Sequence, residues 1–122
     1  MRRMIVAAVL LGIILLGWSI EEKVIGGICS KMIENVEKMQ HATGDELDSL
    51  IEKTRKEWHS NEKILEMLTP HEDTDDINVN WESFNAKIKE GNYSAARITL
   101  AEIGQHFKEM KSKIKVNFQN IF

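Results

Sequence analysis

Residues 2–22 read RRMIVAAVLLGIILLGWSIEE, and this stretch sets the organisation of the whole chain. Its central run, Met4 to Ile20, has 17 residues without a charge and lies between two arginines and two glutamates. A helix of that length spans about 25 Å, just enough to cross the hydrocarbon core of a bilayer. Basic residues favour the cytoplasmic side of a membrane, so we expect the N-terminus inside the cell. The sequence therefore predicts a single-pass membrane anchor over residues 1–20 and an extracytoplasmic part over residues 21–122.

Two other fates of the N-terminal segment are compatible with its composition. A cleaved secretory signal has a shorter apolar run and a small-residue cleavage site, which Val24-Ile25-Gly26 matches poorly. Lipoprotein processing needs a cysteine directly after a small residue, whereas Cys29 follows Ile28. A buried helix of a soluble protein fits worst, because the remaining chain is too short to cover a helix that is apolar all round. An uncleaved anchor fits best.

Beyond Ile20 the chain is acidic. The whole sequence has 16 basic and 19 acidic residues, so without Arg2 and Arg3 the remaining 14 basic residues leave a formal charge of −5. Proteins that bind nucleic acids have a basic surface, so we expect no nucleic-acid partner. The single cysteine, Cys29, excludes an internal disulfide but allows a link between two copies close to the membrane. A homo-oligomer therefore stays open.

Apolar residues after the anchor recur every three or four positions, which is typical of amphipathic helices. A first helix continues the anchor through Gly26-Gly27, a soft point, and ends at His41-Ala42-Thr43-Gly44. Thr43 and Glu46 have the form of a capping box that starts a second helix. That helix ends before Pro70, whose ring disfavours a helical conformation in the preceding residue.

Two further helices follow. Residues Pro70 to Asp76 are predicted to form an acidic connection, with Thr74 or Asp75 capping the third helix. Gly91 supplies a left-handed stop, and Asn92 caps the fourth helix. The fourth helix has the most regular apolar face, made by Tyr93, Ala96, Leu100, Ile103, Phe107, Met110 and Ile114.

Short connections make consecutive helices antiparallel neighbours. We therefore predict an all-α protein in which an N-terminal transmembrane helix is followed by a small antiparallel bundle of three to four helices. Trp58, Trp81 and Phe84 are expected to form the aromatic centre of its core.

The segment after Pro70 has the one local group of residues that resembles a metal site. It contains an imidazole and four carboxylates, in His71, Glu72, Asp73, Asp75 and Asp76. Oxygen ligands suit a hard cation such as calcium, but the alternating spacing, central glycine and distant glutamate of an EF-hand loop are missing. Acidic residues at a helix start are explained more simply by the positive end of the helix dipole. We predict no metal and no cofactor, and keep these five residues as weak candidates.

No pattern of catalytic residues stands out. The sequence has no Gly-x-Ser-x-Gly elbow and no glycine-rich phosphate loop, and Cys29 has no evident histidine partner. His41, His59 and His106 do not form pairs at four-residue spacing. We therefore expect no catalytic residue and no enzymatic activity.

The end of the fourth predicted helix is rich in lysine. Four lysines precede three large apolar residues, in the order Lys108, Lys111, Lys113, Lys115, Phe118, Ile121 and Phe122. Basic residues at a helix C-terminus suit the helix dipole, and they can also contact anionic headgroups or an acidic patch on a partner. The predicted interaction surface consists of His71, Lys108, Lys111, Lys115 and Phe122.

Several features, taken in order along the chain, carry a resemblance to a known family. They are the basic start with its apolar anchor, Trp58 followed by Asn61-Glu62-Lys63, the acidic stretch from His71 to Ile77, and Asn120-Ile121-Phe122. In these features the chain resembles a bacterial family, the domain of unknown function family 4363, found mainly in Clostridia and their relatives. The resemblance implies a small membrane-anchored helical protein of Gram-positive type and assigns no reaction. Members often accompany genes for small membrane proteins of another family, which implies an accessory role.

Two functions follow as hypotheses. The first is a non-enzymatic, membrane-anchored extracytoplasmic helical module that contacts the lipid bilayer and binds or supports another envelope protein. The alternative is a sensor or binding domain for a small ligand or metal, centred on His71 and the adjacent carboxylates.

Overall fold

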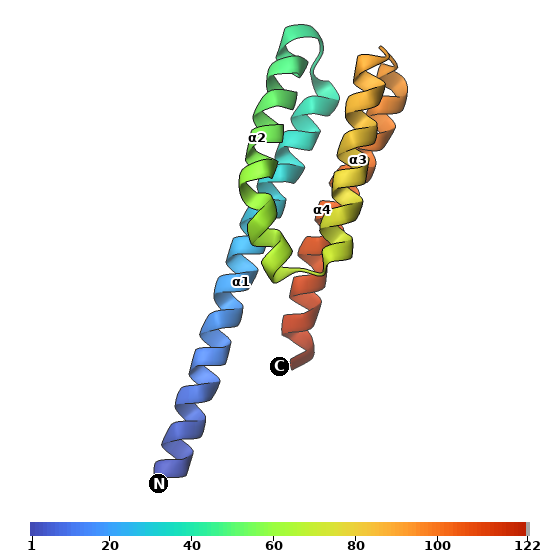
Figure 1. The fold of residues 1–122 in the computed structure, drawn as a ribbon. Coiled ribbons are helices and arrows are strands. Elements are labelled where there is room, and N and C mark those ends of the chain that lie inside the picture. The colour runs from blue at the N-terminus through green and yellow to red at the C-terminus, as the bar shows by residue number, and fades with distance from the viewer. Residues whose placement is uncertain (122) are drawn as a thin grey trace.

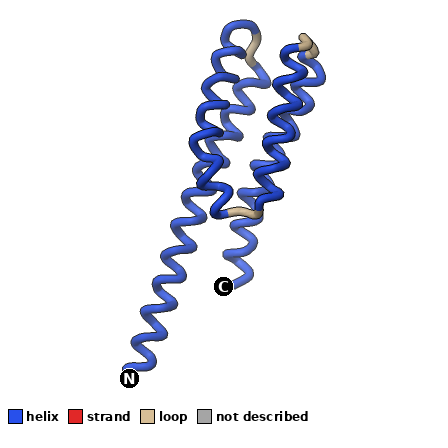
Figure 2. Tube along the Cα trace, viewed as in Figure 1, coloured by secondary structure: helices blue, strands red, loops and turns tan. Residues whose placement is uncertain are grey.

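The computed structural model describes residues 1–121, with side chains through Ile114. This part of the chain forms four α-helices and no strand (Figures 1 and 2). The helices are α1 (Arg2–His41), α2 (Gly44–Leu68), α3 (His71–Lys89) and α4 (Tyr93–Ile121). The predicted fold class is confirmed, since a long apolar N-terminal helix is followed by a helical bundle.

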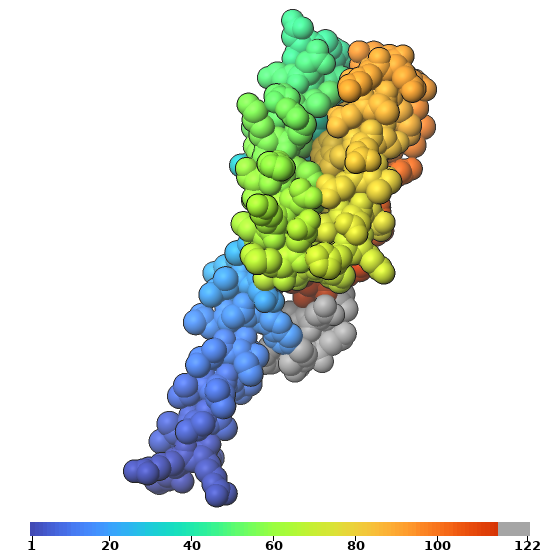
Figure 3. Space-filling model, viewed as in Figure 1, coloured from blue at the N-terminus to red at the C-terminus, as the bar shows by residue number. Residues whose placement is uncertain are grey.

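Helix α1 runs without a break from the apolar segment Met4–Ile20 into the bundle, and Gly26 and Gly27 do not interrupt it. The apolar segment projects from the thicker bundle as a narrow rod (Figure 3). Its large side chains are exposed, as the 61% exposed fraction of Ile5 and the 64% of Leu16 show. By length and composition this helix can serve as a membrane anchor or as a signal sequence.

The second half of α1 forms an antiparallel bundle with the other three helices (Figure 1). Helix α4 packs against both α1 and α3, and α2 packs on α1, whereas α2 and α3 touch only slightly. The order around the bundle is therefore α2, α1, α4, α3. The α2–α3 connection and the end of α4 lie at the end of the bundle from which the apolar segment projects, and the other two connections lie at the far end (Figure 1).

The bundle core is made by the apolar faces that the periodicity predicts, except that Tyr93, predicted to begin the face of α4, is 51% exposed. All four helices contribute buried side chains, among them Ile25, Met32, Val36, Met39, Leu47, Trp58, Leu65, Ile77, Trp81, Phe84, Leu100, Ile103, Phe107 and Met110. Trp81 meets Phe84 edge-on with ring centroids 5.8 Å apart. Trp58 meets Phe107 in the same way at 5.5 Å, so the aromatic centre gains a fourth member from α4.

Several helix ends follow the local signals in the sequence. Thr69, before the proline, is extended with a φ of −129°. Gly91 has a φ of +74°, the left-handed conformation that ends a helix. The Ala95 N–H donates to the side-chain oxygen of Asn92 at 3.3 Å, which is the predicted cap of α4.

Two predictions about helix starts are wrong. Helix α3 begins at His71, not after a cap at Thr74 or Asp75, so the connection consists of Thr69 and Pro70 rather than residues 70–76. Pro70 occupies the N-cap position with a φ of −57°, and its carbonyl oxygen accepts from the Asp73 N–H at 3.1 Å. Thr74 lies buried inside α3, with its hydroxyl donating to the His71 carbonyl at 3.1 Å.

The predicted capping box at the start of α2 is also absent. Thr43 occupies the N-cap position, but its side chain makes no capping hydrogen bond. Helix α2 instead begins with Gly44 in a left-handed conformation, at a φ of +59°.

Candidate interaction surface

The two sequence regions predicted to carry interactions meet at one end of the bundle. Helix α3 begins there with His71, and the lysine-rich part of α4 passes beside it (Figure 1). Lys113 Nζ lies 3.3 Å from Asp73 Oδ1, which joins α4 to the first turn of α3. We call this end, next to the apolar segment, the basal surface. It consists of Lys23, Ser30, His71, Asp73, Lys111, Lys113 and Ile114.

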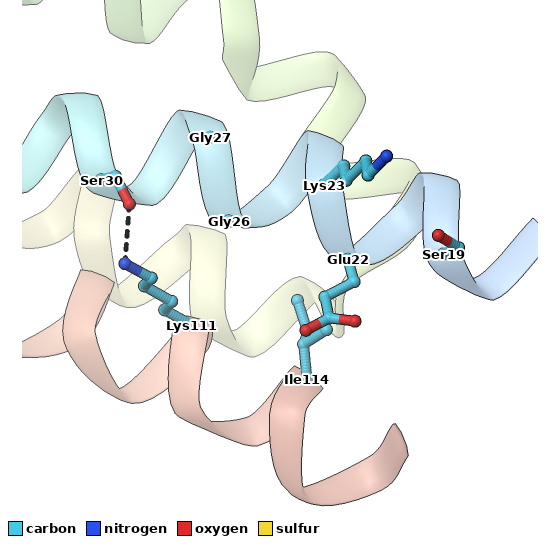
Figure 4. A pocket seen from close by; sticks show the side chains of 8 residues that line it. All are labelled: Ser19, Glu22, Lys23, Gly26, Gly27, Ser30, Lys111 and Ile114. Atoms are coloured by element: carbon cyan, nitrogen blue, oxygen red, sulfur yellow. Dashed lines mark hydrogen bonds between the residues drawn. The ribbon is translucent and has the colours of Figure 1, made fainter. Parts of the chain in front are cut away.

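A groove of about 380 Å³ separates α1 from α4 on the basal surface (Figure 4). Its lining consists of Ser19, Glu22, Lys23, Gly26, Gly27, Ser30, Lys111 and Ile114. The glycines leave space, since a Cβ atom at Gly26 or Gly27 would meet no atom within 4 Å. Lys111 closes one part of the groove by donating to the Ser30 hydroxyl at 2.8 Å, and Glu22 lies beside Ile114 further along (Figure 4).

Cys29 lies in the bundle core and cannot reach a second copy of the chain in this fold. Its exposed fraction is 0%. Burial raises the pKa of the Cys29 thiol to about 12, and the charge of Lys111 offsets only part of that rise. A buried, protonated thiol is inert toward disulfide exchange. The predicted link between two copies through Cys29 would therefore require the bundle to open.

The weak metal candidates do not converge on one point. The exposed ones are His71, Glu72, Asp75 and Asp76. Asp73 is half-buried and pairs with Lys113. Among the residues that the structure describes, no three His, Cys, Asp or Glu side chains are grouped so as to hold a metal ion.

The predicted lysines occupy different faces of α4. Lys108 is exposed, whereas Lys111 is half-buried in the groove. The side chain of Lys115 and the whole of Phe122 lie outside the described residues. Lys113, which the prediction of the interaction surface omitted, contacts Asp73 of α3.

Polar contacts between helices also shape the bundle, and sequence patterns gave no sign of them. Asn35 of α1, with an exposed fraction of 2%, donates to Glu57 Oε2 of α2 at 2.5 Å. The indole of Trp58 donates to Asn78 Oδ1 at 2.7 Å, and the Asn78 amide donates to Glu62 Oε1 at 2.7 Å. The hydrogen bonds of Trp58, Asn78 and Glu62 hold α2 to α3, two helices that otherwise touch only slightly.

Arg97 performs a similar role at the end far from the apolar segment. Its guanidinium donates to the carbonyl oxygens of Gln40 and Ala42, the latter at 3.1 Å, where α1 ends. The Gln40 amide in turn donates to the Arg97 carbonyl at 2.8 Å. Carbonyl groups in the last turn of a helix lack helical partners, so these bonds satisfy them and fasten α1 to α4.

A comparison with protein families finds a match over residues 20–121, to the family described as Domain of unknown function (DUF4363). The match covers most of the chain and confirms the resemblance inferred from sequence features. It extends over the bundle and begins where the apolar segment ends. No curated protein and no solved structure matches the chain.

Proposed function

The chain belongs to the DUF4363 family, and from its architecture we propose that it is a non-enzymatic, membrane-anchored module that binds another envelope protein. The observation that carries the proposal is the double role of α1. One continuous helix has an exposed apolar half and a second half that is built into the bundle core. An exposed apolar surface of that size is stable when lipid covers it. The shared helix would hold the bundle directly at the membrane surface.

The charges around the apolar segment support an extracytoplasmic bundle. Arg2 and Arg3 precede the segment, and Glu21 and Glu22 follow it. Positively charged residues flanking a transmembrane helix stay on the cytoplasmic side. The bundle, with its acidic net charge, would then lie outside the cytoplasm.

The basal surface is the part of the bundle best placed to meet a membrane-bound partner. It lies next to the apolar segment and carries both signs of charge, with the Asp73 carboxylate on α3 and exposed Lys113 on α4. Mixed charges of this kind give register and specificity to a contact with a partner of complementary pattern. An integral membrane protein or an envelope protein that reaches the membrane fits this location.

Photo-crosslinking in intact cells tests the proposal. A photoreactive amino acid replaces His71 or Lys113 in the full chain, and Ile98, which is 65% exposed on the far half of α4, serves as the control position. We expect the probes at positions 71 and 113 to capture one membrane or envelope protein, identified by mass spectrometry, and the probe at position 98 to capture none. Equal capture from all three positions, or no partner protein from any, would contradict the proposal. Capture of a second copy alone would instead support self-association.

The alternative function is a metal or small-ligand sensor centred on His71. In the described part of the chain, no three His, Cys, Asp or Glu side chains are grouped so as to hold a metal ion there. Thermal unfolding with calcium, magnesium and zinc at millimolar concentration tests it directly. A rise in Tm of several degrees with one of these metals would favour this alternative over the accessory role.

A further inference from the structure

We propose that the end of α4 beyond Ile114 rests in the interfacial layer of the membrane and attaches the bundle to lipid at a second place. The proposal rests on the proposed function in one respect, because it requires α1 to span the bilayer. The position of α4 relative to α1 carries the rest of the argument.

The register between the two helices shows how far α4 reaches. They run antiparallel, with Lys111 bonded to Ser30 and Ile114 lying beside Glu22 (Figure 4). Helix α4 continues from Ile114 to Ile121, seven residues further. This distance is about 10 Å at roughly 1.5 Å per residue. Ile121 lies ten residues after Lys111 and seven after Ile114. Counting the same numbers back along α1, from Ser30 and from Glu22, leads to Ile20 and to Leu15, so the end of α4 lies level with the last part of the apolar segment.

The overall shape agrees with this register. The end of α4 extends past the α2–α3 connection on the side of the bundle from which the apolar segment projects (Figure 1). If the apolar segment occupies the hydrocarbon core, the last part of α4 lies at the boundary between headgroups and acyl chains.

The polarity of α4 changes at the same level as the polarity of α1. Along α1 from the bundle toward the N-terminus, Glu21 is the last charged residue before the apolar segment begins at Ile20. On α4 the lysines end at Lys115, directly after Ile114, and residues 116–122 carry no charged side chain. The groove places Ile114 near Glu22, so the two changes of polarity coincide in height. Two helices that reach the same water–lipid boundary are expected to change from charged to apolar residues at the same height.

The composition of this end of α4 suits an anionic bilayer surface. Residues 110–122 contain three lysines and no acidic residue. Lysines near a membrane surface are attracted by anionic lipids, and large apolar residues next to them enter the acyl boundary. Phe118 and Ile121 supply such residues in the sequence. Attachment at two places would keep the bundle from swinging about α1.

A fluorescent probe on single introduced cysteines can locate this end of α4 in the full-length protein. Cys29 stays in place, because its thiol is fully buried and burial raises its pKa to about 12, so we expect no reaction with thiol reagents in the folded bundle. The test variant is Gln119→Cys. Ile98→Cys is the matched control on the same helix, and Ala8→Cys reports on the apolar segment. Each labelled protein is placed in vesicles of equal parts phosphatidylcholine and phosphatidylglycerol, and circular dichroism confirms that it is helical.

Quenching by aqueous iodide and by a nitroxide lipid then gives the position of each probe. We expect the probes at positions 8 and 119 to be quenched by the lipid and to lose quenching by iodide, with the reverse at position 98. Adding Lys115→Glu to Gln119→Cys should reduce lipid quenching at position 119. A contrary result is that iodide quenches the probe at position 119 as strongly as the probe at position 98 while the probe at position 8 stays protected. That result would refute the second attachment and leave the membrane anchor supported. If position 8 is open to iodide, the anchor and the proposed function fail together.

Discussion

Replacing Arg97 with methionine is expected to loosen the end of the bundle far from the apolar segment. The Arg97 guanidinium donates to the carbonyl oxygens of Gln40 and Ala42 and lies 3.5 Å from that of Met39. These groups belong to the last turn of α1, where a cation also interacts favourably with the helix dipole. Methionine keeps much of the length of the side chain but removes the charge and every donor.

The magnitude follows from the number and kind of hydrogen bonds lost. A hydrogen bond that involves a charged group contributes roughly 1.5–3 kcal/mol to the free energy of unfolding. Arg97 is half-buried and makes more than one such bond, but neighbouring water can replace part of them. We therefore expect a loss of about 2–3 kcal/mol, which corresponds to a fall in Tm of roughly 10–20 °C for a domain of this size.

Thermal unfolding of the full chain in a mild detergent, followed by far-ultraviolet circular dichroism, measures this change. Arg55→Met is the matched control, because Arg55 is exposed and pairs only locally with Glu52 on the same helix. Exposed pairs of this kind contribute little to stability. Arg97→Lys should lie between the wild type and Arg97→Met, since lysine keeps the charge but cannot reach several carbonyls with one planar group. A Tm for Arg97→Met no lower than that of Arg55→Met would refute the reasoning.

Three further changes test other parts of the bundle. Phe107→Ala removes a fully buried ring that meets Trp58, and we expect a loss of about 3–5 kcal/mol in the same unfolding assay. The Cys29 thiol should resist alkylation until the bundle unfolds. Burial raises the pKa of the Cys29 thiol from 9.0 to about 12. The stability that the protonated thiol contributes is therefore complete below pH 9.0 and is lost as the pH rises toward 12. Melting curves at alkaline pH should show this decline in the wild type and a smaller one in Cys29→Ala. Asp73→Asn breaks the largely exposed contact with Lys113 and should lower Tm only slightly, whereas a large fall would show that this pair holds α3 to α4.

Helix number and most helix ends could be predicted because their causes are local. An apolar spacing of three and four residues identifies a helix from its own sequence, as the face of α4 from Ala96 to Ile114 shows. The left-handed Gly91 and the cap at Asn92 likewise act within a few residues. Such signals need no knowledge of which helices become neighbours.

The start of α3 was mispredicted because two local signals competed. Thr74 and Asp75 are favourable cap residues, but Pro70 takes the N-cap position and its carbonyl oxygen accepts from the Asp73 N–H, so the helix begins at His71. The acidic residues that follow, Glu72 and Asp73, then lie in the first turn, where the helix dipole favours them. Thr74 is fully buried in the core, and that burial depends on tertiary packing, which the local signals do not show.

The polar contacts between helices could not be predicted, because they depend on the order of the helices around the bundle. Asn35 and Glu57 lie 22 positions apart, and Arg97 and Ala42 lie 55 positions apart. Periodicity shows that each helix has an apolar face but does not say which helix packs beside which. The pairing of Lys113 with Asp73, which joins the two predicted interaction regions, has the same origin.

The shared helix α1 also bears on whether the N-terminal segment is cleaved. The weak cleavage motif Val24-Ile25-Gly26 lies inside α1, and Ile25 is a core residue with an exposed fraction of 1%. Cleavage after Gly26 would remove Ile25, whose burial stabilises the bundle by about 1.5–3 kcal/mol. It would also make Gly27, a poor helix former, the first residue of the helix. Since a whole domain is stable by only about 5–15 kcal/mol, the bundle is much better supported by an intact α1. The packing of Ile25 therefore argues against cleavage after Gly26.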